Sequence, residues 1–157
     1  GPEWRRKPAE DPFSEARGLR FNVPVTTALQ AGLSLAAFEQ EGRRDERKHL
    51  LGLDFLWSRA RWEFSGEAVY RDSSQGPEQV EKGGFLQAVV PLGGRLYGVG
   101  RIESLRVAGS DSASRIAIVG LDYRYGRAVS LKAEWLRGSH LPDGVSQGVL
   151  ASVSVLF

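Results

Sequence analysis

The sequence contains neither cysteine nor methionine among its 157 residues. Without cysteine the chain forms no disulfide bond and no thiolate metal site. Without methionine it has no initiator residue, so we expect it to begin inside a longer precursor. It also has no run of apolar residues long enough for a transmembrane helix, which needs about 18 or more.

The sequence also lacks an excess of charge of one sign. Lysine and arginine together number 21 and aspartate and glutamate 19, which gives a formal net charge of +2. The basic residues are dispersed, which argues against a dedicated nucleic-acid surface. The glycine pair at 98–100 is not followed by a helical pattern, and the acidic stretch at 72–82 lacks the regular carboxylate spacing of a calcium loop. We therefore expect no nucleic acid, no cofactor and no metal.

The dominant pattern that is present is an alternation of apolar and polar residues, whereas helical periodicity is weak. In "LLGLDFLW", Leu51, Leu53 and Phe55 share one face of an extended strand, and Gly52 and Asp54 share the other. This period of two is typical of strands with two different faces. It predicts nine strands, at residues 17–25, 29–38, 49–57, 61–71, 84–92, 95–107, 115–125, 128–137 and 145–157.

The connections between these strands alternate in length, and this favours a membrane barrel over a sandwich. Two or three residues separate strands one and two, three and four, five and six, and seven and eight, whereas the other connections are longer and polar. Transmembrane β-barrels have short periplasmic turns and longer outer loops. Most predicted strands are long enough to cross a bilayer at a tilt, which takes about 9–11 residues.

Aromatic residues near the strand ends indicate a membrane-interface girdle. Trp57 and Trp62 flank one short turn, Tyr97 follows another, and Phe157 lies at the same level. We expect the interface aromatics to be Trp57, Trp62, Tyr123, Tyr125 and Trp135.

The number of strands predicts an incomplete barrel. If the short turns and Phe157 are periplasmic, the first strand starts on the outer side, and residues 1–16 form an outer loop or a disordered lead. Bacterial single-chain barrels have an even number of strands with both ends periplasmic. Residues 17–157 are therefore expected to be the C-terminal part of a larger antiparallel up-and-down barrel. The alternative is that the first two strands are one bent strand near Pro24, which gives a complete barrel of eight.

The last residues resemble the C-terminal signature strand of outer-membrane barrels, with a terminal aromatic residue preceded by apolar residues at alternate positions. The matching residues are Val149, Ala151, Val153, Val155 and Phe157. "GGFLQAVVPLGGRLYGVGRIESL" and "LLGLDFLW…WEFSGEAVY" are similar to strands and turns of porins of the phosphate-selective O/P-like group. The resemblance implies a bacterial outer-membrane location and recognition by the barrel-assembly machinery. The basic loop lysines of the phosphate-selective members lie in regions that do not align with this chain, so the resemblance does not imply anion selectivity.

The charged residues of the polar faces are candidates for lining a pore. Facing lipid, an Arg or Lys near the bilayer midplane would cost about 2–4 kcal/mol, and facing a lumen removes this cost. The predicted pore-lining residues are Arg20, Asp54, Arg61, Glu63, Glu67, Arg71, Arg101, Glu103, Asp122, Arg124, Lys132 and Glu134. Their signs balance, which favours weak ion selectivity. They predict a passive channel for small polar solutes or ions, or alternatively an ion-paired lumen in a non-conducting structural or adhesion barrel. A soluble ligand-binding barrel is a third reading.

No enzyme is expected. Ser139, His140 and Asp143 are neighbours on one loop, whereas catalytic triads assemble from residues distant in sequence. The basic loop residues Arg43, Arg44, Arg47 and Lys48 could contact lipopolysaccharide phosphates or form a solvated loop. The expected partners are the lipid bilayer, lipopolysaccharide, the barrel-assembly machinery and, as an open alternative, further copies of the chain in a homotrimer.

Overall fold

The computed structural model consists of strands and connections. It describes residues 13–40, 47–73, 80–107, 109–110, 112–126, 128–141 and 147–155. Four residues named above lie outside the described residues. They are Phe157, at the end of the last predicted strand, the outer-loop residues Arg43 and Arg44, and Asp143. Within these ranges no helix has the length and the hydropathy that crossing a membrane would require.

All nine predicted strands are present. They are β1 (Phe13–Pro24), β2 (Leu29–Gln40), β3 (Arg47–Arg59), β4 (Trp62–Ser73), β5 (Glu81–Gly93), β6 (Leu96–Arg106), β7 (Ser114–Tyr125), β8 (Val129–Ser139) and β9 (Gly148–Val155). β1 begins at Phe13, four residues before the predicted start. β1 and β2 are separate strands joined by a turn after Pro24, so the reading of one bent strand is wrong.

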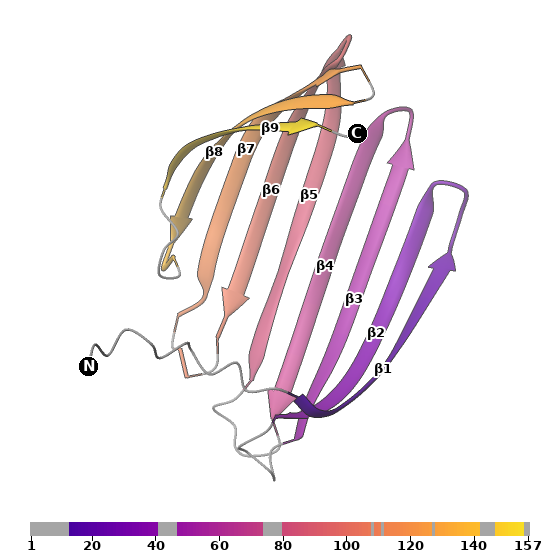
Figure 1. The fold of residues 1–157 in the computed structure, drawn as a ribbon, viewed down its shortest axis with the longest axis vertical. Coiled ribbons are helices and arrows are strands. Elements are labelled where there is room, and N and C mark those ends of the chain that lie inside the picture. Colours follow the sequence, from indigo (N-terminus) through magenta and orange to yellow (C-terminus); the bar gives the residue numbers. More distant parts are fainter. Residues whose placement is uncertain are drawn as a thin grey trace, which may run out of the picture.

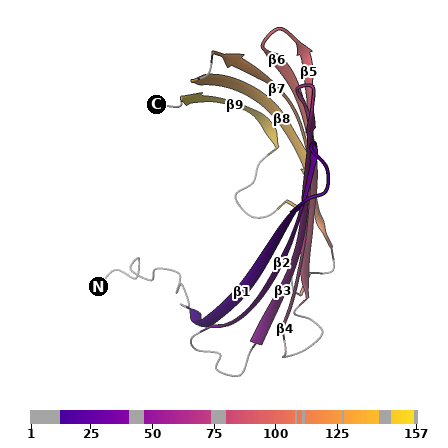
Figure 2. The same ribbon diagram turned by 90° about the vertical axis from the view of Figure 1, so that its right-hand side faces the viewer.

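The strands form one antiparallel sheet in the order of the sequence, from β1 at one edge to β9 at the other. Each strand pairs only with its sequence neighbours, and β1 and β9 do not pair with each other within the described residues. The sheet is therefore an up-and-down meander that is not closed into a cylinder (Figure 1). Seen from the side it is a curved wall with one concave and one convex surface (Figure 2).

The sheet is a single layer without an apolar core. Phe55, Phe64, Leu121 and Val153 would be enclosed in a sandwich, but they are 37%, 38%, 48% and 67% exposed. Among the described residues, Val89 and Tyr97 are the buried apolar side chains. The described part of the chain therefore lacks the packed interior that stabilises a water-soluble β-domain.

The register between strands advances steadily across the sheet. One row of directly opposed residues runs through Trp57, Phe64, Ala88, Gly100, Val119 and Trp135. We counted the residues between this row and the strand end at the short turns. There are two on β3 (to Arg59), four on β6 (to Leu96) and six on β7 (to Tyr125). Each hairpin thus extends two residues further than the one before, which is one residue per strand.

This stagger sets the tilt of the strands. A strand rises about 3.3 Å per residue, and neighbouring strands lie about 4.8 Å apart. For the short turns to lie in one plane, the strands must tilt by roughly 35° from the normal to that plane. Barrel strands typically tilt by about 35–45°. The register of this open sheet is therefore the register of a barrel wall.

Gly66 in β4 lies where two large side chains meet on one face. A Cβ atom at this position would be 2.6 Å from Cε1 of Phe55 and 2.7 Å from Cδ2 of Leu86. Both distances are far below van der Waals contact. The missing side chain therefore lets the ring of Phe55 and the side chain of Leu86 lie over the backbone of β4.

We expect Gly66→Ala to lower the free energy of unfolding by about 1–3 kcal/mol, because Phe55 and Leu86 must both move. Gly100→Ala is the matched control, since a Cβ atom at Gly100 meets nothing within 4 Å. Because alanine loses less conformational entropy on folding than glycine does, this control should be neutral or slightly stabilising. Reversible urea unfolding of each variant in lipid or detergent measures the difference. Equal effects of the two substitutions would contradict the packing at Gly66.

Candidate functional site

Cross-strand pairing places the predicted pore-lining residues on one face of the sheet. Directly opposed residues of an antiparallel pair share a face, so the pairing of Asp54 with Glu67, of Glu67 with Phe85 and of Phe85 with Glu103 links β3 to β6. The same parity holds across all eight strand pairs, apart from register shifts at two strand ends, next to Phe13 in β1 and to Gly93 in β5. It brings onto this side Arg20, Asp54, Glu63, Glu67, Arg71, Arg101, Glu103, Asp122, Arg124, Lys132 and Glu134. We call this side the charged face.

The charged face is the concave face. The backbone N–H of Arg124 donates a hydrogen bond to the carbonyl of Arg95, so it points from β7 toward β6. For L-residues, the direction of the strand and of its N–H group together determine on which side the side chain projects. With β7 and β6 arranged as in Figures 1 and 2, the side chain of Arg124 projects into the concave side.

Arg20 connects the first three strands on this face. Its guanidinium donates to the carboxylate of Asp54 at 2.9 Å, to the hydroxyl of Ser34 at 3.0 Å and to the amide oxygen of Asn22 at 3.2 Å. Gly32 lies opposite Asp54, and a Cβ atom there would be 2.6 Å from its Oδ1. The absence of a side chain at Gly32 therefore gives the carboxylate its place between β2 and β3.

Arg101 forms the corresponding contacts in the middle of the sheet. Its Nε lies 2.5 Å from the carboxylate of Glu103, and its Nη1 lies 3.5 Å from the amide oxygen of Gln87. Its guanidinium carbon lies 3.9 Å from the centre of the Phe85 ring. The cation is thus held by a charge and an aromatic face. Further toward the long connections, Arg71 pairs with Glu81.

Tyr97 is surrounded by cations near the short turns. Arg61 donates from Nε to the Tyr97 hydroxyl at 3.0 Å and from Nη2 to the carbonyl of Gly94 at 2.6 Å. The guanidinium carbons of Arg61 and Arg124 lie 4.9 Å and 4.1 Å from the centre of the Tyr97 ring. Tyr97 is buried on the charged face, so its expected place in the interface girdle is wrong.

Asp122 is the least exposed carboxylate of the charged face, with 4% of the residue exposed. It accepts hydrogen bonds from the hydroxyl of Ser130 and, at 3.0 Å, from Nε of Arg124. Lys132 lies directly opposite it on β8. In contrast, Glu63, Glu67 and Glu134 have no ion pair within the described part of the chain. On this face the arginines are mostly paired, and three carboxylates remain open to solvent.

The opposite, convex face carries no charge over most of its height. This uncharged region, which we call the apolar band, is made of the alternate residues in 19–23, 29–37, 51–57, 62–70, 84–90, 96–104, 117–125, 129–135 and 149–155. None of these residues is Asp, Glu, Lys or Arg. Its tallest strands span eight residue steps, or about 22 Å at the tilt derived above. The apolar band of outer-membrane barrels is about 25 Å tall.

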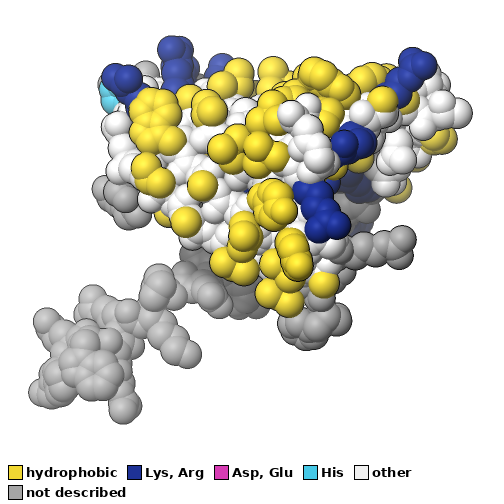
Figure 3. All heavy atoms as spheres, turned by 90° about the horizontal axis from the view of Figure 1, so that it is seen from above, with side chains coloured by type: hydrophobic (Ala, Val, Ile, Leu, Met, Phe, Trp, Pro, Cys, Tyr) yellow, Lys and Arg dark blue, Asp and Glu magenta, His cyan; other side chains and the backbone are white. Residues whose placement is uncertain are grey.

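Aromatic side chains of the apolar band gather near the short turns. Trp57 and Trp62 flank the β3–β4 turn, and the Phe64 ring lies 5.4 Å and 6.3 Å from them. Tyr123 and Tyr125 end β7. Seen from the end with the short turns, hydrophobic side chains gather beside Lys and Arg side chains (Figure 3). Trp135 is six residues along β8 from its short turn, so it lies toward the other edge of the band.

The last strand presents the predicted assembly residues. Val149, Ala151, Val153 and Val155 are cross-strand partners of the band residues of β8, and so belong to the apolar band. β9 pairs with β8 on one side and, within the described residues, with no strand on the other. Its free edge is therefore available for pairing.

No family model matches this chain, and no curated protein matches it by sequence. Among solved structures, the sheet is similar to an anion-selective porin from Comamonas acidovorans, with a TM-score of 0.65 and 17% sequence identity. The similarity covers 89% of this chain and 44% of that porin, so the chain spans less than half of the length of the porin. At this identity the likeness concerns the fold alone. The chain has the fold of a porin-like β-barrel wall.

Proposed function

We propose that the chain forms part of the wall of an outer-membrane channel for the passive diffusion of small polar solutes or ions. The observation that carries the proposal is the division of charge between the two faces. Fourteen charged residues of the described part of the chain lie on the concave side, namely the twelve predicted ones, with Arg61 in its turn, together with Lys48 and Glu81, and the apolar band on the convex side has none. A water-filled lumen and a lipid exterior are the two environments that match these faces.

The exposed apolar band supports a lipid environment. Monomeric soluble proteins rarely expose contiguous apolar patches larger than a few hundred Å², because such patches associate in water. Here most of the convex face of nine strands is apolar, and its large side chains are exposed. Contact with lipid would remove this surface from water without requiring a second protein layer. This argues against the alternative of a soluble ligand-binding barrel.

The charged face supports a pore that selects mainly by size. Paired arginines and carboxylates along one wall produce local fields of opposite sign, which order water and solutes without strongly favouring either ion. The described charged face carries as many acidic as basic residues, and its carboxylates without an ion pair in the described part of the chain are those of Glu63, Glu67 and Glu134. A non-conducting barrel with an ion-paired lumen is the alternative, and current through the intact protein separates the two.

We further infer two partners from the same surface. The alternate apolar residues of β9 and its free edge fit recognition by the barrel-assembly machinery. The convex face could also pack against further copies of the chain in a homotrimer. Both rest on the lipid-facing orientation of the apolar band.

The orientation of the faces is tested by two leucines close together in β3. Leu53 belongs to the apolar band, whereas Leu56 lies on the charged face opposite Ser65. We expect Leu53→Arg to make the free energy of folding into a bilayer less favourable by about 2–4 kcal/mol, because the guanidinium would face hydrocarbon. Leu56→Arg should change it by less than about 1 kcal/mol. Equilibrium folding into liposomes at a series of urea concentrations gives both values, and the reverse order would overturn the assignment of faces.

The channel is tested by planar-bilayer recording of the intact protein. We expect stepwise conductance with weak selectivity. Glu67→Gln combined with Glu134→Gln should shift the reversal potential in a salt gradient toward that of anions, because two open carboxylates are lost from the lumen. Glu15→Gln combined with Glu39→Gln, which neutralises two carboxylates on the convex face, is the matched control and should leave it unchanged. Absence of current from correctly folded protein would overturn the channel.

A further inference from the structure

Four basic residues lie on the convex face immediately beyond the apolar band. They are Lys82, Arg106, Arg115 and Arg137, one on each of the strands β5 to β8. Arg106 is ten residues from Leu96 and Arg115 ten from Tyr125, each counted from the short-turn end of its strand. Because the register advances by one residue per strand, these equal counts place Arg106 and Arg115 at one level. Lys82 is directly opposite Arg106, and Arg137, eight residues from Val129, lies two residues nearer the short turns. We call this row the basic row; it lies at the edge next to the long connections.

The basic row has no protein counter-charge among the described residues. Lys82 is directly opposite Arg106, and like charges in that position destabilise a strand pair. None of the four makes an ion pair within the described part of the chain. The nearest carboxylate on this face along the pairing is that of Asp72, which faces Nδ1 of His49 at 3.5 Å. Asp72 is two residues from Tyr70, the direct partner of Lys82, so it is a diagonal neighbour of the row. On β6 to β8 the described residues of this face include no carboxylate beside the three arginines.

The same edge of the sheet is neutralised on β1 to β4. There Arg17 lies 2.5 Å from a carboxylate oxygen of Glu15, and Arg47 lies 2.7 Å from one of Glu39. One half of the edge therefore carries internal ion pairs, and the other half carries only cations. This contrast within the described part of the chain makes the basic row a candidate site for an anionic ligand.

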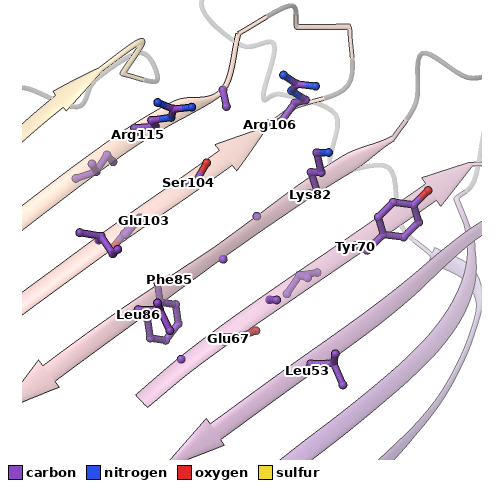
Figure 4. Close-up of a pocket in the computed structure, with 18 of the residues that line it drawn as sticks. Leu53, Glu67, Tyr70, Lys82, Phe85, Leu86, Glu103, Ser104, Arg106 and Arg115 are labelled. Carbon is purple, nitrogen blue, oxygen red and sulfur yellow. The ribbon is translucent and has the colours of Figure 1, made fainter. Parts of the chain in front are cut away.

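A hollow in the apolar band adjoins the basic row. It has a volume of about 1280 Å³, and Lys82, Arg106 and Arg115 line it at one end. Its floor is made of small residues such as Ala68 and Gly84, and large residues flank them: Leu53, Leu86 and Ile102. Figure 4 shows Tyr70, Lys82, Arg106 and Arg115 along the strand ends, with Leu53 and Leu86 further along the strands. Cations at the mouth of an apolar hollow are complementary to an anionic headgroup with hydrocarbon chains.

We propose that the basic row binds the phosphates of lipopolysaccharide while an acyl chain occupies the hollow. The proposal rests on the lipid-facing orientation of the apolar band. The long connections of such barrels face outward, so the basic row would lie at the level of the outer-leaflet headgroups. Four adjacent strands spread the cations over about 15 Å. This width suits a headgroup with two phosphates and several acyl chains better than the single phosphate of a glycerophospholipid. The site is distinct from the loop residues Arg43 and Arg44.

The test compares two pairs of neutralised arginines in the intact protein. Arg106→Gln with Arg115→Gln removes two members of the basic row, and Arg59→Gln with Arg95→Gln removes two arginines from the short-turn end. Native mass spectrometry with added deep-rough lipopolysaccharide measures affinity. Each cation near a membrane surface contributes about 1 kcal/mol toward anionic lipid, so the first pair should weaken binding about tenfold or more. The second pair should stay within about twofold of the unaltered protein.

Folding and charge are checked with two further variants. Arg106→Lys with Arg115→Lys keeps the charges and should bind within about threefold of the unaltered protein. Lys82→Gln with Arg137→Gln should reproduce the loss if the first pair does not fold. Unchanged binding in every neutralised pair that folds would overturn the proposal.

Other occupants give different results. Equal affinity of the unaltered protein for phosphatidylglycerol would overturn the assignment to lipopolysaccharide. Dissociation of an oligomer in the Arg106→Gln, Arg115→Gln variant without any lipid present would instead make the row a contact between copies of the chain, and would also overturn the proposal. Channel activity is measured in a separate experiment, as planar-bilayer current. Protein that binds lipopolysaccharide in the expected pattern but passes no current would overturn the channel and uphold the site.

Discussion

The structure depends on one constraint, which is that directly opposed residues of neighbouring strands share a face. In nine antiparallel strands this constraint passes from strand to strand, and the register shifts only at the ends of β1 and β5, so each strand must assign its charges to the same side. Arg20 in the first strand and Glu134 in the eighth obey it equally. A slip of one residue in any single pairing would place the arginines of one hairpin on the apolar side. The separation of charge is therefore a property of the whole register.

The two faces satisfy their side chains in different ways. On the concave face, arginines are held by carboxylates, amide oxygens and the rings of Phe85 and Tyr97, so the cations remain fixed although solvent can reach them. The convex face has no such contacts because it has no charges to satisfy until its edges. At the edge next to the long connections, Arg17 of β1 and Arg47 of β3 form ion pairs, whereas the cations of β5 to β8 form none among the described residues. The asymmetry between these edges distinguishes the two halves of an otherwise repetitive sheet.

Much of this arrangement could be predicted from the sequence because its period is two residues. Alternation predicts the nine strands and the face of each predicted lumen charge that lies within a strand, including Arg101 and Glu103. The position of Tyr97 near a turn predicts a place in the interface girdle, but its odd number in the strand of Arg101 and Glu103 indicates the charged face, where the structure has it. Alternation alone does not predict that Lys82 and Arg106 lie at one level. Their common level follows from the stagger, which requires the pairing of every strand.

The stagger of one residue per strand also constrains how such a sheet can change in evolution. Inserting a single residue within a strand would exchange the two faces beyond that point and bring charge into the apolar band. Inserting two residues would preserve the faces but shift one hairpin along its neighbours by about 7 Å. Length variation should therefore accumulate in the long connections, where neither error arises. Related sequences with this sheet should have constant strand lengths and long connections of variable length.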